Sequence, residues 1–92
     1  MVEWDEDKRQ SNIRKHRVDF FDSNEWEWDA ALVFADERKD YGERRFIAYV
    51  PIGRRLHVVI FTERNDTRRL ISARKANMRE IRYYEKKMDH SN

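Results

Sequence analysis

Residues Arg45–Arg74 read RFIAYVPIGRRLHVVIFTERNDTRRLISAR. The segment contains three runs rich in apolar and β-branched residues, and the first two runs end in residues that favour turns. The middle run is apolar at consecutive positions, which is typical of a central strand covered on both faces. We therefore expect an antiparallel meander of three strands, at residues 45–50, 56–62 and 68–74, with turns at 51–54 and 63–67.

The sequence on both sides of this meander predicts a helix. Before it, Asp5 is a good N-cap followed by acidic residues, so we expect a helix at residues 5–16. This helix has only one large apolar residue, Ile13, so its polar face should remain free. After the meander we expect a helix at residues 75–88 that covers the sheet. Its apolar positions follow helical spacing: Met78, Ile81, Tyr84 or Glu85, and Met88.

The segment between the first helix and the meander allows two interpretations. We expect a short helix near residues 19–24, followed by a strand at 25–34, because Glu and Trp alternate at its start. A helix is the competing interpretation for 25–34, since its Ala and Leu residues favour one. Residues 36–43 should form a loop. At strand spacing, Trp26 and Trp28 are expected to lie in the core rather than to stack on nucleic-acid bases.

The composition fits one small ordered domain, which we assign to residues 1–92. The charged fraction is 41% and the hydrophobic fraction only 39%, but three Trp, four Tyr and five Phe can each bury a large area. The predicted fold class is α+β, with a small antiparallel sheet of three to four main strands flanked by N-terminal and C-terminal helices. Between Arg38 and Arg82, basic residues outnumber acidic ones more than twofold. Such an excess indicates either a surface that binds a polyanion or an ordinary solvated surface.

Several classes of site are excluded by what the sequence lacks. It has no cysteine, so a disulfide scaffold or a thiolate nucleophile is impossible. No apolar run has the length of a signal peptide or a membrane span, so we expect a cytoplasmic protein. The His and carboxylate residues lack metal-ligand spacing and two Gly cannot build a phosphate loop, so we expect no metal and no cofactor. The tail at residues 89–92, which includes His90, should be frayed and without a role.

The polar face of the first helix carries residues suited to a phosphodiester substrate. Helical spacing places Lys8, Asn12 and Lys15 on one face and pairs Asn12 with His16. His16 ends the helix, where the helix dipole favours the charged imidazolium. The competing interpretation is a solvated basic face on which His16 only caps the helix. His57 lies in the most apolar strand and is expected to be a hydrogen-bonded core residue.

The predicted strands supply a second group of candidates. Simple alternation would place Leu70, Ser72 and Arg74 on one face together with Arg68. Arg64 closes the neighbouring strand, so its guanidinium and that of Arg74 could hold one phosphate between them. The competing interpretation is a pair of surface arginines that bind nearby carboxylates.

Taken together, these elements resemble a known family. The motifs are Trp4-Asp5-x-x-Lys8-x-x-x-Asn12-x-x-Lys15-His16-x-Val18-x-Phe20, Tyr41-Gly42-Glu43-x-Arg45, Leu56–Thr62, and Ile71-Ser-Ala-Arg74-Lys-Ala-Asn77-x-Arg79-Glu80 with Tyr84. In this order and spacing they resemble the BrnT family, the toxin half of bacterial type II toxin–antitoxin pairs. The resemblance extends from Trp4 to about Tyr84.

The resemblance implies a RelE-like fold and a metal-independent endoribonuclease that slows growth by cutting RNA. It also implies a DNA-binding antitoxin of the BrnA kind, which wraps the toxin and brings the complex to operator DNA. The expected reaction is attack of a ribose 2′-hydroxyl on its own 3′-phosphate. A non-catalytic copy that binds an antitoxin or a nucleic acid is the alternative. Direct DNA binding is disfavoured, because no helix-turn-helix signature is present.

The resemblance also assigns expected roles to the candidate residues. His16 and Lys15 would move protons and Arg64 and Arg74 would hold the phosphate, which makes these four the catalytic group. The expected RNA-binding group is Lys8, Asn12 and Ser72. In the family a Gly usually follows the Lys-His pair, but Arg17 stands there in this chain. A non-Gly residue with positive φ costs about 1 kcal/mol, unless the turn moves and His16 points elsewhere.

Overall fold

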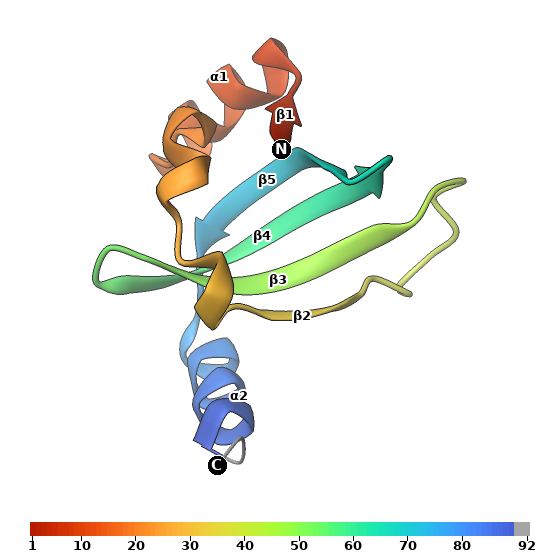
Figure 1. Cartoon of the computed structure of the whole chain (residues 1–92). Helices are drawn as coiled ribbons and strands as arrows, with labels where there is room; N and C mark the ends of the chain where they lie inside the picture. The colour runs from red at the N-terminus through yellow and green to blue at the C-terminus, as the bar shows by residue number, and fades with distance from the viewer. Residues whose placement is uncertain (90–92) are drawn as a thin grey trace.

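The computed structural model describes residues 1–89, in which a five-stranded sheet has a helix near each end of the chain (Figure 1). The elements in chain order are β1 (Val2–Trp4), α1 (Glu6–His16), the 3-10 helices η1 (Phe20–Glu25) and η2 (Trp28–Ala30), β2 (Leu32–Ala35), β3 (Arg45–Ile52), β4 (Arg55–Arg64), β5 (Thr67–Lys75) and α2 (Met78–Asp89). The strands lie in the order β1-β5-β4-β3-β2. The α+β fold class is confirmed. The expectations for His90 and the end of the tail fall on residues 90–92, outside the described part of the chain.

The meander of β3, β4 and β5 forms as expected, with β4 at its centre. β4 pairs antiparallel with both neighbours, and its buried side chains are His57, Val58, Val59, Phe61 and Thr62. The β3–β4 turn contains Gly53 at φ 61°, and the β4–β5 turn contains Asn65 and Asp66 at φ 52° and 66°. Gly, Asn and Asp adopt positive φ most readily, so these two turns set the pairing register of all three strands.

The sheet differs from the predicted meander at one edge. β1 pairs with β5 in parallel, with Val2 beside Arg68 and Trp4 beside Leu70. The sheet is therefore mixed and has five strands, where three to four antiparallel ones were expected. Three residues are too few to show an alternation pattern, and the partner of β1 lies far along the chain, so no local signal reveals this pairing.

The predicted strand at residues 25–34 is wrong in its first half. Only Leu32–Ala35 pairs with β3, while Trp26 follows η1 and Trp28 begins η2. Trp26 is 7% exposed, and the indole of Trp28 donates to the carbonyl of Ser23 at 2.8 Å. Large aromatic side chains can bury their area from turns that lie over a sheet, without being part of a strand. The expectation that both Trp residues belong to the core is confirmed.

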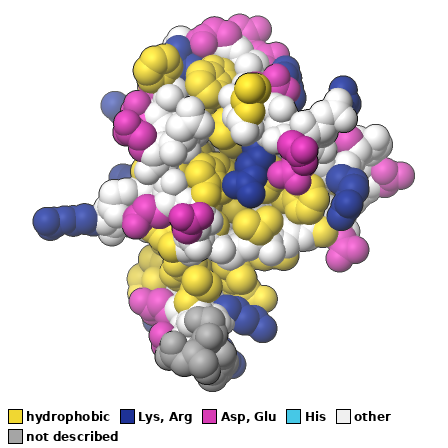
Figure 2. All heavy atoms as spheres, viewed as in Figure 1, with side chains coloured by type: hydrophobic (Ala, Val, Ile, Leu, Met, Phe, Trp, Pro, Cys, Tyr) yellow, Lys and Arg dark blue, Asp and Glu magenta, His cyan; other side chains and the backbone are white. Residues whose placement is uncertain are grey.

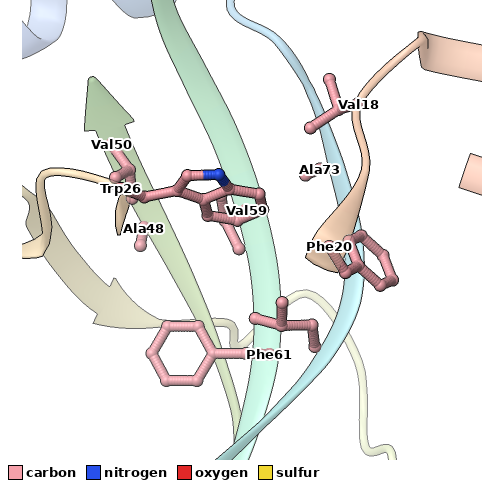
Figure 3. Close-up of a cluster of buried hydrophobic side chains, with 9 residues drawn as sticks. Val18, Phe20, Trp26, Ala48, Val50, Val59, Phe61 and Ala73 are labelled. Atoms are coloured by element: carbon pink, nitrogen blue, oxygen red, sulfur yellow. The ribbon is translucent and has the colours of Figure 1, made fainter. Parts of the chain in front are cut away.

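The two faces of the sheet have different environments. On the face that we call the packed face, Val18, Phe20 and Trp26 cover side chains of the strands (Figure 3). The covered side chains are Ala48, Val50, Val59, Phe61, Leu70 and Ala73. We call the opposite face of the sheet the open face. Residues that pair across neighbouring strands point to the same face. The open face carries the alternate residues of the same strands: Ile47, Tyr49, Val58, Ile60, Ser72 and Arg74.

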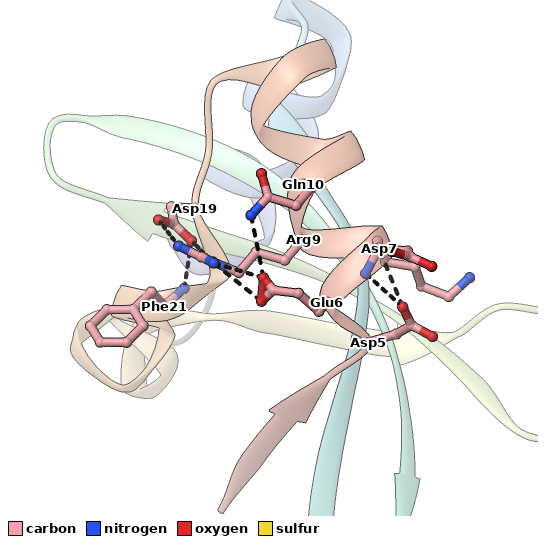
Figure 4. A network of polar contacts seen from close by, with 8 residues as sticks. Asp5, Glu6, Asp7, Arg9, Gln10, Asp19 and Phe21 are labelled. Atoms are coloured by element: carbon pink, nitrogen blue, oxygen red, sulfur yellow. Dashed lines mark hydrogen bonds and ion pairs between the residues drawn. The ribbon is translucent and has the colours of Figure 1, made fainter.

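Helix α1 is held by polar contacts rather than by an apolar stripe. Asn12 is 4% exposed, and its side-chain amide bonds both backbone groups of Ala73 and the carbonyl of Val18 at 2.8–2.9 Å. β1 ends before it reaches Ala73, so Asn12 supplies the partner that this part of β5 lacks. Arg9 donates from Nε and Nη2 to the Asp19 carboxylate, at 2.7 and 3.0 Å, and ties the helix to the start of η1 (Figure 4). These contacts explain how a helix with so little apolar surface stays docked.

The expectation that the C-terminal helix covers the sheet is wrong. Helix α2 projects away from the end of the sheet (Figure 1), and none of its residues 78–89 is buried. Tyr84 anchors it by donating to the carbonyl of Ala30 at 2.7 Å, and Ile81 and Tyr84 line a hollow against the β3–β4 hairpin. β5 runs to Lys75 and leaves the sheet at the hairpin end, so α2 starts beyond the sheet and not above it.

Candidate functional site

A β-bulge decides which side chains of β5 reach the open face. Leu70 and Ser72 pair with consecutive residues of β4, so Ile71 between them is an extra residue. Arg68 and Leu70 therefore lie on the packed face, whereas Ser72 and Arg74 lie on the open face. The expectation that all four share one face is wrong, because simple alternation does not foresee the extra residue.

The structure separates the two arginines that were expected to hold one phosphate. Arg74 lies opposite Val58, whereas Arg64 lies opposite Thr67 at the other end of the β4–β5 hairpin. The six-residue step along β4 from Val58 to Arg64 corresponds to about 20 Å. The joint clamp is therefore wrong, because the last residues of two neighbouring antiparallel strands lie at opposite ends of the pair. Each arginine needs a role of its own.

Arg74 presents a free pair of donors on the open face. Its Nη1 donates to Glu80 at 3.0 Å and to the carbonyl of Lys75 at 3.2 Å, and its Nη2 donates to Glu80 at 2.8 Å. A guanidinium has five N–H donors, so the Nε–H and one Nη2–H have no acceptor among the described residues. These two donors lie on one edge of the planar group, and parallel donors of this kind fit two oxygens of a phosphate. The Arg74 side chain is 42% exposed.

Glu80 holds Arg74 from the first turn of α2. Glu80 and Asn77 form a reciprocal capping box, in which each side chain accepts from the other residue's backbone N–H at 2.9 Å. The Arg74 guanidinium, helped by the Asn77 N–H, holds the pKa of Glu80 below its usual value. The same pair raises the pKa of Arg74. Both groups are therefore charged near neutral pH, and their contact sets the direction in which the free edge of Arg74 points.

An aromatic cluster lies on the open face, and its member Tyr49 is near Arg74. The rings of Phe34, Tyr49 and Tyr83 contact one another edge to face, with centroids 5.4–6.5 Å apart. Burial, helped by the charge of Glu80, raises the pKa of the Tyr49 hydroxyl, so this phenol keeps its proton. Tyr83 is 45% exposed. Exposed rings of this kind can stack on bases while a neighbouring arginine binds the backbone phosphate.

The β2–β3 loop is held together by a buried carboxylate and its partners. Asp36 is buried, and its two carboxylate oxygens accept from Nε and Nη2 of Arg38 at 2.7 Å. The Arg38 guanidinium, helped by the Tyr41 hydroxyl, lowers the pKa of Asp36 to about 2. Arg45 stacks over the Tyr41 ring at 4.1 Å. Asp36 neutralises the charge of Arg38, so this pair fixes the loop without adding net charge to the open face.

The expected residues of α1 lie along the free edge of β5. Asn12 uses its amide on Ala73 and Val18, so it acts as a structural clip. Lys8 and His16 stand one helical turn before and after Asn12, and Lys15 is exposed beside His16. Within residues 1–89, no hydrogen bond or ion pair engages the side chains of these two lysines or of His16. They stand at the edge of the sheet, not at the centre of the open face.

The turn after α1 keeps its geometry without a glycine. Arg17 adopts φ 61° and ψ 29°, and its N–H closes the helix by donating to the carbonyl of Ile13 at 2.9 Å. The missing glycine therefore strains the backbone by about 1 kcal/mol but does not move the turn. His16 keeps the place that a helix with a terminal glycine would give it.

The remaining histidine inside the described chain has a structural role. His57 is buried on the packed face, its Nδ1 lies 2.9 Å from the carbonyl of Arg55, and burial lowers its pKa. The expectation of a core histidine is confirmed. In residues 1–89, no three His, Asp or Glu side chains gather as they do around a metal ion. No helix of the same residues has the length and apolarity needed to cross a membrane.

Sequence reasoning missed the surroundings of Arg74. Tyr49, Glu80 and Tyr83 join it only because β3, β5 and α2 meet at one end of the open face. The Asn77-x-x-Glu80 spacing is that of a capping box, and this signal could have marked Glu80 as a fixed carboxylate. Nothing local marks Tyr49, which is one of several aromatic residues in the strand pattern.

The surface over the packed face is acidic. The segment through η1 and η2 contains no Lys or Arg, and its acidic residues are Asp19, Asp22, Glu25, Glu27 and Asp29. Figure 2, which views the molecule from the side of these 3-10 helices, shows Asp and Glu side chains spread over them. A polyanion would be repelled from this surface. The open face, with its arginines, is the side that suits an anionic ligand.

The sequence of the chain matches the model of a known protein family. The sequence model of a family described as the ribonuclease toxin, BrnT, of type II toxin–antitoxin systems matches residues 4–80. The match includes every strand from β2 to β5, helix α1, and the first turn of α2 with Glu80. No curated protein matches the chain.

Proposed function

Because the chain belongs to the BrnT family of ribonuclease toxins from type II toxin–antitoxin systems, we propose that it cuts RNA at Arg74 on the open face, without a metal ion. The family supplies the class of activity. The free donor edge of Arg74 is the observation that carries the choice of place. The aromatic rings beside it and the acidic surface on the other side support the same choice.

The proposed reaction is an internal transesterification. The 2′-oxygen of a ribose bonds to its own 3′-phosphorus, the bond from phosphorus to the 5′-oxygen breaks, and a 2′,3′-cyclic phosphate and a 5′-hydroxyl result. Negative charge grows on the two non-bridging oxygens in the transition state. The Nε and Nη2 donors of Arg74 fit these oxygens, and preorganised donors of this kind typically contribute about 10²–10³ in rate. Ser72, on the same face, would bind the backbone beside them.

Two protons must move in this reaction. The 5′-oxygen needs a proton as it leaves, and the phenol of Tyr49, which is protonated near neutral pH, would supply it, although burial raises its pKa and makes it a weaker acid. The 2′-hydroxyl must lose a proton as it attacks. Either His16 or Lys15 in its neutral form would take it, which requires the nucleotide whose phosphate Arg74 holds to lie within hydrogen-bond reach of the end of α1. Such acid–base help typically contributes about 10²–10⁴ in rate.

The other residues of α1 have supporting roles in this proposal. Lys8 stands at the same edge and would bind a neighbouring phosphate of the strand. Asn12 has no free group on its amide, so we assign it the task of holding α1 on β5 rather than contact with RNA.

The alternative function is a toxin-like protein that binds RNA or an antitoxin without cutting RNA. The feature that favoured it was the missing glycine after His16. The left-handed conformation of Arg17 keeps the turn in place, which weakens that argument. Cutting therefore remains our proposal, and binding without cutting is an outcome of its test.

The family also implies an antitoxin protein as partner. We propose that it is a BrnA-like protein that contacts operator DNA itself, so that this chain meets DNA only through it. The chain would bind both its RNA substrate and its antitoxin in the cytoplasm.

Cleavage of a labelled single-stranded RNA in EDTA tests the proposed function. The parent protein should cut, and Arg74→Ala should lower the rate about 100-fold or more. Arg74→Lys keeps the charge but loses the paired donors, so its rate should stay close to that of Arg74→Ala. Arg54→Ala is the matched control, because Arg54 is exposed in the β3–β4 turn and makes no ion pair within residues 1–89.

Two further variants separate the proton-transfer roles. Tyr49→Phe and His16→Ala should each lower the rate by about 10²-fold or more if these residues move a proton. Unchanged cleavage by His16→Ala would reduce His16 to a cap of the helix. If the folded parent protein cuts no RNA, binding without cutting replaces the proposal. Cleavage that stops in EDTA would contradict the metal-free mechanism.

A further inference from the structure

A second group of arginines lies at the far end of the open face. We infer that it binds a phosphate of the same RNA strand, several nucleotides away from the cut, and this inference rests on the proposed function. Residues of β1, of the loop before β3, of the end of β4 and of β5 line a hollow of about 210 Å³ at this end. Its lining residues are Glu3, Glu43, Arg44, Thr62, Glu63, Arg64 and Arg69.

The glutamates of this hollow already have arginine partners. The three ion pairs are Arg69–Glu3 at 3.4 Å, Arg68–Glu63 at 3.4 Å and Arg45–Glu43 at 3.6 Å. The lining itself holds three arginines and three glutamates, but Arg45 and Arg68 from outside the lining pair with two of these glutamates. Arg44 and Arg64 make no ion pair within the described chain. These two unpaired arginines favour an anion, and Arg64 lies on the open face, in the row of β4 residues that leads back to Val58 opposite Arg74.

The open face connects this hollow to Arg74. Along β4, Thr62 and Arg64 lie four and six residues from Val58, the partner of Arg74, which corresponds to about 14 and 20 Å. Half-buried side chains such as Ile47 and Ile60 lie between the two ends. A single strand of roughly three to six nucleotides spans this length, depending on how far its bases stay stacked.

A nucleic-acid strand suits this arrangement better than a protein segment does. Arginines at both ends can bind backbone phosphates, while the aromatic and aliphatic side chains between them can contact bases of any sequence. Ribose and phosphate repeat at every nucleotide, so the same strand can reach both ends. The hollow should therefore strengthen binding of RNA long enough to reach it and leave the chemistry at Arg74 unchanged.

The dependence of kcat/KM on RNA length tests this inference. The preferred cut is first mapped in a long labelled RNA, which is then trimmed step by step on each side of the cut. The expected result is a rise in kcat/KM of about tenfold once one flank reaches roughly four nucleotides, followed by a plateau. Trimming the other flank should have a smaller effect.

Variants of the hollow should remove this gain. Arg64→Ala, and Arg64→Ala combined with Arg69→Ala, should raise KM for the long RNA by up to about tenfold without changing kcat. Cleavage of the shortest RNA should stay unchanged, and the salt dependence of binding should become weaker by about one phosphate contact for each arginine removed. Arg14→Ala is the matched control, since Arg14 is an exposed arginine of α1. Thermal unfolding of each variant confirms that it folds.

The outcomes separate this inference from the proposed function. If the parent protein cuts all lengths equally, or if the double variant keeps the gain, the inference is wrong and the proposed function stands. If the parent protein cuts no RNA of any length, both fail. If the variants keep the length dependence but bind the antitoxin more weakly, these arginines serve the protein partner and the inference is overturned.

Discussion

The packed face and the open face of the sheet differ in what holds their side chains. On the packed face, Phe20 and Trp26 fill the space over the strands, and backbone groups are satisfied by the Asn12 clip. On the open face, Arg74 and Tyr83 stay partly exposed and are held by ion pairs and ring contacts. A chain of 92 residues has too little apolar surface to cover both faces. The uncovered face is therefore where preorganised charges can meet a ligand.

The bulge at Ile71 makes this division possible. Without the extra residue, Arg68 and Arg74 would share one face. With it, Arg68 lies over the Trp28 ring at 4.5 Å on the packed face, and Arg74 points to the other side. One added residue thus places two arginines of the same strand on opposite faces of the sheet.

The variant Asn12→Ala should destabilise the packing of α1 on β5 and leave the side chains of the open face unchanged. Both backbone groups of Ala73 and the carbonyl of Val18 would lose their buried partner, so the free energy of unfolding should fall by about 2–3 kcal/mol. Urea unfolding measures this loss. Gln10→Ala, an exposed residue of α1, is the control and should change stability little.

Cleavage by the folded fraction of Asn12→Ala sharpens the comparison. We expect its rate to stay close to that of the parent protein, because the amide has no free group for RNA. A variant that is fully stable but inactive would show instead that Asn12 contacts the substrate.

The pair Glu80→Ala and Asn77→Ala tests the open face in the same way. Both variants lose part of the capping box of α2, but only Glu80→Ala releases Arg74. We expect kcat to fall about tenfold or more for Glu80→Ala, because Arg74 loses its fixed direction, and to change little for Asn77→Ala. Glu80→Gln should keep part of the rate, since its amide oxygen can still accept from Arg74. Equal loss in the Ala variants would mean that only the position of α2 matters.

The variant Arg17→Gly tests the strained turn between the two sides. Glycine adopts the observed φ of 61° without strain, so stability should rise by up to about 1 kcal/mol. The thermal unfolding midpoint measures this gain. Cleavage should not change, because Arg17 already keeps the turn in place. A clear gain in cleavage would indicate that Arg17 misplaces His16.

The smallest expected effect concerns Asp36 in the β2–β3 loop. Its pKa is lowered to about 2 in the folded protein from an ordinary 3.8, so its contribution to stability is present above about pH 4. That contribution should be lost as the pH falls from about 4 to about 2. Urea unfolding at several pH values measures this loss. The free energy of unfolding of the parent protein should exceed that of Asp36→Asn above about pH 4, and the two values should converge as the pH falls to about 2. Arg38→Ala removes the partner of Asp36, so its difference in free energy of unfolding from the parent protein should shrink over the same pH range. A difference that stays constant with pH would contradict the lowered pKa of Asp36.

Local signals predicted much of the fold and little of the site. The meander, its two turns and the N-cap at Asp5 follow from residue preferences over a few positions, and the structure contains all of them. The predicted strand at 25–34 was partly wrong, because packing of Trp26 and Trp28 against the core decides the local conformation, and the alternation of neighbouring residues does not. Arg74 was found as a candidate, but its partners were not.

The sequence by itself determined the β3–β5 meander, the two terminal helices and membership of a ribonuclease toxin family. These depend on caps, turns and hydrophobic spacing, which act between residues close along the chain. Only the tertiary structure decided that Ile71 is a bulge, that α2 stands beyond the sheet, and that Glu80 and Tyr49 meet Arg74. These features depend on pairings between segments far apart in the chain, whose register is set by the packing of the whole core and by no single segment.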